Sequence, residues 1–343
     1  ALLVWALITP IPCRAEMRVE VVPAALGKQL VRASVPFPRG FLREGQGLEA
    51  ISAGRTLPIA VRVLGEYPTR GSEKPSVRRA MLTWPCDFST RDPMSIELRP
   101  VEASANSQFE SPNEIRWMED RLQIDRRPSQ KADSVDASNM MVVAQWIADL
   151  KPVAKPRVDV VESNRYFDWR RFHIQDDHFS YVVEVRSDVL GVVALRLHVQ
   201  SLEESRYRAP DLGWIISPPG RSGHLRTAAR SNSVGDEIVR HSFDGGVPCS
   251  LQIDDVNLIV ESPTAAWMRR GDVEIQHRNG GLIWRYHRRR ASEKVPMQWM
   301  SWRKCDVVVR PAEVAPLTAT LEYPHEVRVH SSVWDEAYHI GEA

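Results

Sequence analysis

The stretch Val35-Pro36-Phe37-Pro38-Arg39-Gly40, joined with the later stretch Ser76-Val77-Arg78-Arg79-Ala80-Met81, decides the fold class. The two prolines restrict φ and the final glycine tolerates a left-handed backbone, so the first piece predicts a tight turn. The second piece runs on to Trp84 with apolar and polar residues alternating, as in a strand with one buried face. We expect both pieces to belong to one small β-barrel.

Short strand-like segments surround these two pieces. They lie at residues 17–22, 48–51, 57–64, 77–84 and 95–100, and turns containing Gly, Pro or Ser separate them. Short strands with turns at close spacing are typical of small barrels and sandwiches. We therefore expect the barrel to occupy residues 16–103.

The middle of the chain has a different composition. Ser, Asn, Asp and Arg dominate residues 101–140. We expect an exposed connector over residues 104–156, with a strand pair near residues 115–118 and 122–124. From residue 157 the alternating pattern returns with many short strands, which predicts a β-sandwich over residues 157–325. The expected fold is all-β: a small β-barrel followed by a larger β-sandwich.

The two ends of the chain carry separate expectations. Residues 1–15 combine an apolar run with a small residue at Ala15, as in a truncated signal peptide, so a secreted or periplasmic location is expected. Residues 326–343 are expected to begin a further C-terminal element. After the leader, Cys86, Cys249 and Cys305 allow at most one disulfide and leave an odd thiol, and buried structural thiols are the favoured interpretation.

Charge and length exclude several partners. Lys and Arg total 45 against 44 Asp and Glu, so no charge excess attracts nucleic acid or a membrane surface. No apolar run is long enough for a transmembrane helix. The chain has 11 Trp residues, and indole rings serve either as core side chains or as flat platforms for sugar rings.

Aromatic and basic residues gather near the end of the predicted sandwich. Arg can fork onto a carboxylate while aromatic faces support a sugar ring, so this cluster predicts a site for an acidic polysaccharide or glycan. An edge strand followed by a solvated basic loop is the competing interpretation. The candidate substrate-binding residues are Trp284, Arg285, Tyr286, His287, Trp299, Trp302 and Arg303.

A second aromatic and basic cluster covers residues 166–173, and Asp176, Asp177 and His178 follow it. These three side chains could ligate Ca²⁺, but the alternating oxygens and the Gly turn of a calcium loop are missing. A polar turn is the favoured interpretation, so we expect no metal and no cofactor. The sequence has no motif of a serine hydrolase, a nucleotide-binding loop or a zinc protease.

The two opening pieces, with Leu57-Pro58-Ile59 between them, resemble the N-terminal RIFT-barrel domain of exo-rhamnogalacturonan lyase-like (YetA-like) proteins. In that family a turn of the V-P-F-P-x-G type precedes an L-P-x-x-like strand and a strand similar to S-V-R-x-A-L. The resemblance implies a RIFT-like barrel and then a central β-sandwich, which corresponds to the second half here by order and class only. It also implies a missing C-terminal α/α-toroid that holds much of the catalytic cleft.

The resemblance implies a function as well. We expect the N-terminal, non-toroid portion of a secreted polysaccharide lyase-like protein that acts on acidic, rhamnogalacturonan-like polysaccharide by β-elimination. This portion would serve as scaffold and substrate approach, so its own enzymatic status stays open and its catalytic residues are unknown. The alternative is a non-catalytic glycan-binding or cell-surface β protein, and a third hypothesis is a purely structural β protein with buried Trp residues.

Overall fold

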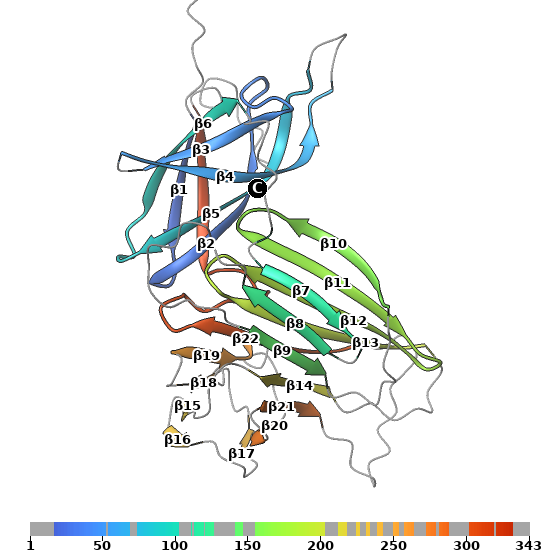
Figure 1. Ribbon diagram of the computed structural model, residues 1–343. Helices are drawn as coiled ribbons and strands as arrows, with labels where there is room; N and C mark the ends of the chain where they lie inside the picture. Colours follow the sequence, from blue (N-terminus) through green and yellow to red (C-terminus); the bar gives the residue numbers. More distant parts are fainter. Residues whose placement is uncertain are drawn as a thin grey trace, which may run out of the picture.

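A computed structural model gives the structure of the chain (Figure 1). Its named elements are all β-strands, which confirms the all-β class. Within the part of the chain that it describes, no helix is long and apolar enough to cross a membrane. The described residues are 17–52, 54–68, 74–102, 111, 113–119, 121–126, 141–146, 155–202, 212–217, 224–226, 231–233, 239–242, 250–253, 257–263, 272–278, 281–287, 302–318 and 320–331.

The first sheet curls into a nearly closed barrel of seven strands in the order β2-β5-β4-β3-β6-β1-β23. Its two end strands meet where the backbone N–H of Arg32 donates to Nε2 of His325 at 3.3 Å. The strands are β1 (Met17–Pro23), β2 (Gly27–Pro36), β3 (Gln46–Ser52), β4 (Arg55–Glu66), β5 (Val77–Phe88), β6 (Met94–Glu102) and β23 (His325–Ser331).

The two pieces of sequence that predict the barrel lie against each other, because β2 and β5 are antiparallel neighbours. Just after β2, the N–H of Gly40 donates to Oγ of Ser76 at 2.7 Å. The N–H of Phe37 donates to the carbonyl oxygen of Arg78 at 2.9 Å. Gly40 has a φ of +85°, a backbone conformation that suits glycine. The turn is therefore fastened to the start of β5.

The second part of the chain is a sandwich of two antiparallel sheets. One has nine strands in the order β10-β11-β12-β13-β22-β19-β18-β15-β16, and the other has seven in the order β17-β20-β21-β14-β9-β8-β7. The strands of the nine-stranded sheet are β10 (Arg157–Ser163), β11 (Phe167–Gln175), β12 (Phe179–Asp188), β13 (Val193–Ser201), β15 (His224–Arg226), β16 (Ser231–Ser233), β18 (Ser250–Ile253), β19 (Leu258–Glu261) and β22 (Trp302–Pro311). Those of the seven-stranded sheet are β7 (Asn113–Met118), β8 (Arg121–Arg126), β9 (Met141–Trp146), β14 (Leu212–Ser217), β17 (Val239–Ser242), β20 (Asp272–Arg278) and β21 (Gly281–His287).

The nine-stranded sheet is buried on both faces along its middle strands. On β22, Val307 and Val309 belong to the core between the two sandwich sheets. Val308, between them, belongs to a separate core that also holds Leu30 of the barrel strand β2. A strand covered on both faces is apolar at every position, which explains this unbroken run of valines. The barrel and the sandwich therefore share a packed apolar junction.

Two boundaries expected from the sequence differ in the structure. The stretch 104–156, expected as a connector, contributes β7, β8 and β9, which pair in series at one edge of the seven-stranded sheet. The predicted strand pair is present as β7 and β8. β9 was not predicted as a strand, because a short apolar run such as Met141–Trp146 does not distinguish a strand from a helix.

The other difference concerns the C-terminal end. The first residues of the stretch expected to begin a further element form β23, which pairs with β1 and places Val327 opposite Val21 in the barrel. A strand that returns from the far end of the chain to complete a sheet gives no local sequence signal. Residues 1–15, expected as a signal peptide, and residues 332–343 lie outside the described residues.

Candidate functional site

A row of side chains crosses the first three strands of the nine-stranded sheet, on the face toward the barrel. Glu162 on β10 stands opposite Trp169 on β11, and Trp169 stands opposite Arg186 on β12. Residues directly opposite on neighbouring strands have side chains in contact. The guanidinium of Arg186 accordingly lies 4.0 Å from the ring centroid of Trp169, a cation–π arrangement.

Arg32 reaches this row from the barrel strand β2. Its Nη2 lies 2.7 Å from Oε2 of Glu162, and its guanidinium lies 4.0 Å from the ring centroid of Phe167. The side chains of Arg32 and Glu162 are only 5% and 3% exposed. Nε of Arg32 is buried and has no hydrogen-bond partner among the described residues.

Arg186 has a buried carboxylate of its own. Its Nη2 lies 2.9 Å from Oε1 of Glu184, whose side chain is 5% exposed. Burial lowers the pKa of Arg186, and the charges of Glu184 and Glu322 act in the opposite direction. Arg186 therefore remains a cation held in a poorly solvated place.

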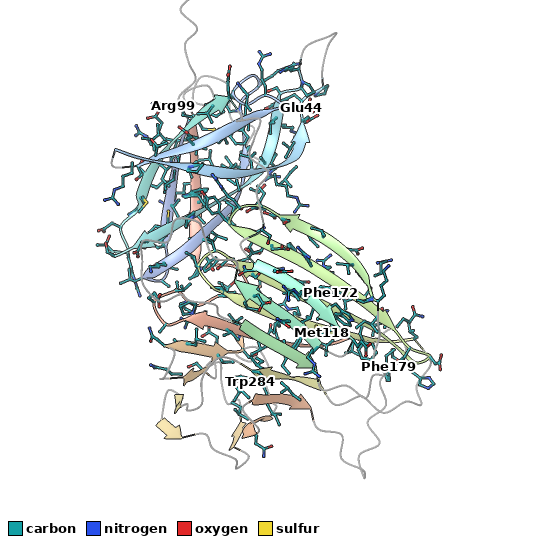
Figure 2. The ribbon with its side chains drawn as sticks, in the orientation of Figure 1. Glu44, Arg99, Met118, Phe172, Phe179 and Trp284 are labelled. Carbon is teal, nitrogen blue, oxygen red and sulfur yellow. The ribbon has the colours of Figure 1, made fainter. Side chains whose placement is uncertain are left out.

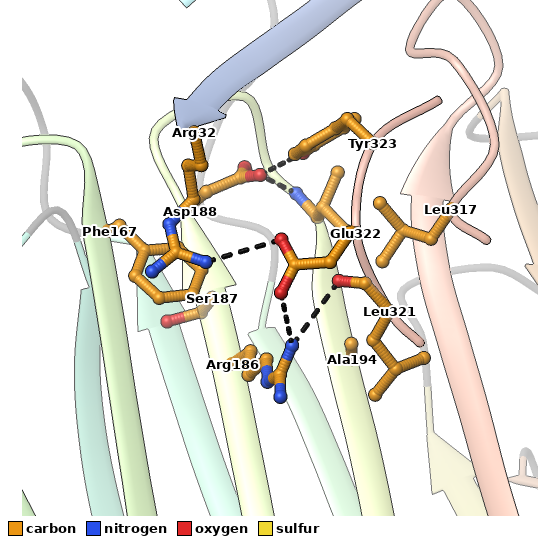
Figure 3. Close-up of a pocket in the computed structure, with 11 residues that line it drawn as sticks. Arg32, Phe167, Arg186, Ser187, Asp188, Ala194, Leu317, Leu321, Glu322 and Tyr323 are labelled. Atoms are coloured by element: carbon orange, nitrogen blue, oxygen red, sulfur yellow. Dashed lines mark hydrogen bonds and ion pairs between the residues drawn. The ribbon is translucent and has the colours of Figure 1, made fainter. Parts of the chain in front are cut away.

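Glu322 joins the two arginines. Its Oε2 accepts from Nη1 of Arg32 at 3.3 Å and its Oε1 accepts from Nη1 of Arg186 at 3.2 Å. Figure 3 shows the Glu322 carboxylate pointing between the two guanidinium groups. Glu322 comes from the segment between β22 and β23, and its side chain is 43% exposed. We call Arg32, Arg186 and their two aromatic supports, Phe167 and Trp169, the arginine cradle.

A small pocket adjoins the cradle, and Asp188, Ser187 and Tyr323 form part of its wall. The Tyr323 hydroxyl donates to Oδ2 of Asp188, and burial together with the Asp188 charge raises the Tyr323 pKa well above its ordinary value. Oγ of Ser187 is buried without a partner among the described residues. The space open to the centre of a water-sized molecule is about 10 Å³, which suits one water rather than a sugar ring.

His325 lies on the barrel side of the cradle. Its Nε2 contacts the backbone of Arg32, and burial is the main cause that lowers its pKa. The ring is therefore neutral near pH 7, but it is held by the barrel backbone. The site can bind a carboxylate through two guanidinium groups. It has no free general base in the described part of the cradle, since Tyr323 keeps its proton.

The structure removes Trp284 from the predicted glycan site. Its side chain is fully buried in the sandwich core, opposite Trp214 on the neighbouring strand (Figure 2). The prediction that it offers a face to a sugar is wrong, because an apolar ring on the inner face of a sheet is core. Arg285, Tyr286 and His287 continue β21, whereas Trp302 and Arg303 belong to β22 of the other sheet. The side chains of these five residues, and the whole of Trp299, lie outside the described part.

The second aromatic and basic cluster has a clearer outcome, because it builds the junction. Phe167 and Trp169 support the cradle, and the Tyr166 hydroxyl donates to the carbonyl oxygen of Pro58 in the barrel at 2.7 Å. Asp176 shapes a polar turn, since its Oδ1 accepts from the N–H groups of His178 and Phe179 at 2.8 and 2.6 Å. Among the described residues, no group of three metal-ligating side chains comes together.

Sequence reasoning missed Arg32, Arg186 and Glu322. Each lies in an ordinary-looking segment, and the chain positions that meet are far apart. The available signal was a charged residue inside a mostly buried strand, because Arg186 lies within a run of buried positions on β12. A charge there requires a partner.

Two thiols can be placed. Cys86 and Cys305 are free, and burial is the main cause that raises the Cys86 pKa to about 11 and the Cys305 pKa well above its ordinary value. Cys305 is a buried thiol of the kind that the sequence favoured, whereas Cys86 is half-buried, and both are poor nucleophiles at neutral pH. Cys249 lies outside the described residues.

The fold and the site define an all-β protein in which a small barrel and a sandwich share a buried, charge-paired junction. No protein-family model matches the chain, and no curated protein matches it significantly. Among solved structures, the chain is similar to a protein in the Glycosyl Hydrolase Family 38 from Enterococcus faecalis, with a TM-score of 0.48 and 9% identity over 93% of this chain and 48% of that chain. The chain thus spans about half the length of that protein, and so distant a likeness carries no inference about activity.

Proposed function

We propose that this chain is the barrel-and-sandwich part of a polysaccharide lyase-like protein that acts on acidic polysaccharide. Its role is scaffold and substrate approach. The observation that carries the proposal is the arginine cradle, where guanidinium groups from the barrel and from the sandwich converge on one carboxylate beside aromatic rings. An acidic polymer presents a carboxylate on every uronate, and paired guanidinium groups suit that group.

The barrel gives a second line of support. The pieces that carry the resemblance to the lyase-like family are neighbours in space, joined from Gly40 to Ser76. A barrel followed by a sandwich is also the order that the resemblance implies. The same resemblance supplies the remaining parts of the proposal: a secreted or periplasmic protein, and an α/α-toroid as the partner that completes the cleft.

A division of labour follows from the chemistry of β-elimination. A lyase must neutralise the uronate carboxylate, remove the C5 proton with a base and protonate the leaving oxygen. The cradle offers the first of these. Tyr323 is held protonated by burial, and His325 is engaged with the backbone of Arg32. The proposal therefore assigns proton transfer to the toroid.

Affinity electrophoresis tests the approach role. The chain is run in native gels that contain polygalacturonate, neutral galactan or dextran sulfate. We expect retardation in polygalacturonate, none in galactan, and less in dextran sulfate, because the planar guanidinium fork matches a carboxylate. Equal mobility in polygalacturonate and galactan would reject the proposed role. Equal retardation in polygalacturonate and dextran sulfate would show that the chain attracts polyanions by charge alone and does not recognise carboxylates.

A further inference from the structure

Each arginine of the cradle has a buried carboxylate that lies closer than Glu322. Arg32 already has Glu162 at 2.7 Å and Arg186 already has Glu184 at 2.9 Å. Both of these glutamates are almost fully buried and belong to regular strands. Arg62 and Arg171 contact the same two glutamates at 3.4 Å, but their side chains are 45% and 41% exposed, so solvent screens these two further charges. Glu322 is thus an additional carboxylate at the solvent side.

The contacts of Glu322 are also the looser ones. They measure 3.2 and 3.3 Å, against the 2.7–2.9 Å that is usual for charge-assisted hydrogen bonds. Arg186 shares the same Nη1 with the carbonyl oxygens of Thr320 and Leu321, each at 3.4 Å. The Glu322 side chain is partly exposed and comes from a segment outside any strand. Its departure would leave the strands and both buried ion pairs in place.

An unused donor remains beside this carboxylate. Nε of Arg32, which lines the pocket, is buried without a partner among the described residues. Buried donors normally have an acceptor. Asp188, the other carboxylate in the wall, is already engaged by the Tyr323 hydroxyl and by the N–H groups of Leu190 and Val192. The wall therefore has hydrogen-bonding capacity for oxygen atoms that Glu322 does not supply.

We propose that the arginine cradle is a binding site for the carboxylate of an external acidic sugar, and that Glu322 is a built-in carboxylate that occupies the site until the ligand displaces it. The rings of Phe167 and Trp169 hold the two guanidinium groups in a fixed geometry at 4.0 Å. An external ligand can bind only those molecules from which the internal carboxylate has withdrawn. The apparent affinity for the ligand is therefore its intrinsic affinity multiplied by that fraction. The choice of a uronate as ligand rests on the proposed function, whereas the carboxylate site rests on the geometry alone.

Calorimetric titration of the wild-type chain and three variants with galacturonate, galactose and acetate tests this inference. Glu322→Gln removes the charge and keeps the shape, and Glu322→Ala empties the position. Glu313→Ala is the matched control, because Glu313 lies in the same segment but pairs with the exposed Lys28. Urea unfolding of each protein verifies that it is folded before the titration.

We expect both Glu322 variants to bind galacturonate at least about tenfold more tightly than the wild type, since the internal competitor is gone. Glu313→Ala should match the wild type, and galactose should bind to none of them. Equal galacturonate affinity in all four proteins, or weaker binding by the folded Glu322 variants, would overturn the proposal. If the Glu322 variants bound acetate as tightly as galacturonate, the sugar assignment would be wrong. None of these outcomes depends on the electrophoresis in polymer gels. Failure of this inference can therefore be told apart from failure of the proposed function.

Discussion

Nη2 of Arg32 on the barrel strand β2 lies 2.7 Å from Oε2 of Glu162 on the sandwich strand β10, with both side chains almost fully buried. A buried ion pair contributes little net stability, but removal of one partner is costly because the other charge is stranded. The barrel and the sandwich therefore fit together well only when both charges of this pair are in place.

Arg32→Met tests this condition. It leaves the buried Glu162 with only the longer ion pair from Arg62 and a neutral hydrogen bond from Asn164 at 2.8 Å, so we expect a loss of about 3–5 kcal/mol in the free energy of unfolding. Arg62→Met is the control, because Arg62 lies 3.4 Å from the same carboxylate but is 45% exposed; its loss should stay below about 1 kcal/mol. Urea denaturation measures both, and equal losses in the two variants would contradict the account.

Two glycines with a positive φ separate backbone strain from steric contact. A Cβ on Gly40, with φ of +85°, would meet nothing within 4 Å, whereas a Cβ on Gly27, with φ of +106°, would lie 2.7 Å from the carbonyl oxygen of Glu313. We expect Gly40→Ala to cost about 1–2 kcal/mol and Gly27→Ala about 3 kcal/mol. Thermal unfolding of the two variants checks the order of the two losses. A larger loss for Gly40→Ala than for Gly27→Ala would show that Gly27 does not hold β2 against the segment after β22.

The sequence predicted the parts of this fold that have local signals. Alternating residues identified β12 and β13, and the prolines and Gly40 identified the turn after β2. The barrel was incomplete in that prediction because two of its seven strands were missing: β2, and β23, which returns from the other end of the chain. Trp284 was misplaced because an aromatic residue followed by basic residues has the same pattern whether the ring faces a groove or the core. The cradle was invisible, since Arg32, Arg186 and Glu322 meet only through the tertiary fold.

The assignment of Trp284 to the core leads to a stability prediction. Trp284→Ala removes a fully buried indole, so we expect a loss of about 3–5 kcal/mol in the free energy of unfolding. Trp284→Phe should lose clearly less, because most of the buried volume is kept. Urea denaturation followed by circular dichroism measures both losses. If the Trp284→Ala protein were fully stable but bound glycan more weakly, Trp284 would be a surface residue of the glycan site and not a core residue.

The stability of the protein should fall in mild acid. Burial lowers the pKa of His325 and of His198 in the folded state, while the unfolded chain keeps histidine at about 6.5. Below that pH the unfolded state binds more protons, so the free energy of unfolding decreases as the pH drops from about 6.5 toward the folded pKa values. Urea unfolding at a series of pH values tests this. His325→Gln should reduce the slope, and an unchanged slope in a double variant with His198→Gln would show that other groups cause it.

The central claim is that this barrel and sandwich guide an acidic polymer without cleaving it. Ultraviolet detection of unsaturated product on rhamnogalacturonan tests the claim most directly, with this chain compared against the longer, toroid-containing protein that the proposal expects. The account predicts product from the longer protein and none from this chain at equal concentration. Product formed at the same rate by this chain alone would contradict it, and no product from either would favour a non-catalytic glycan-binding protein.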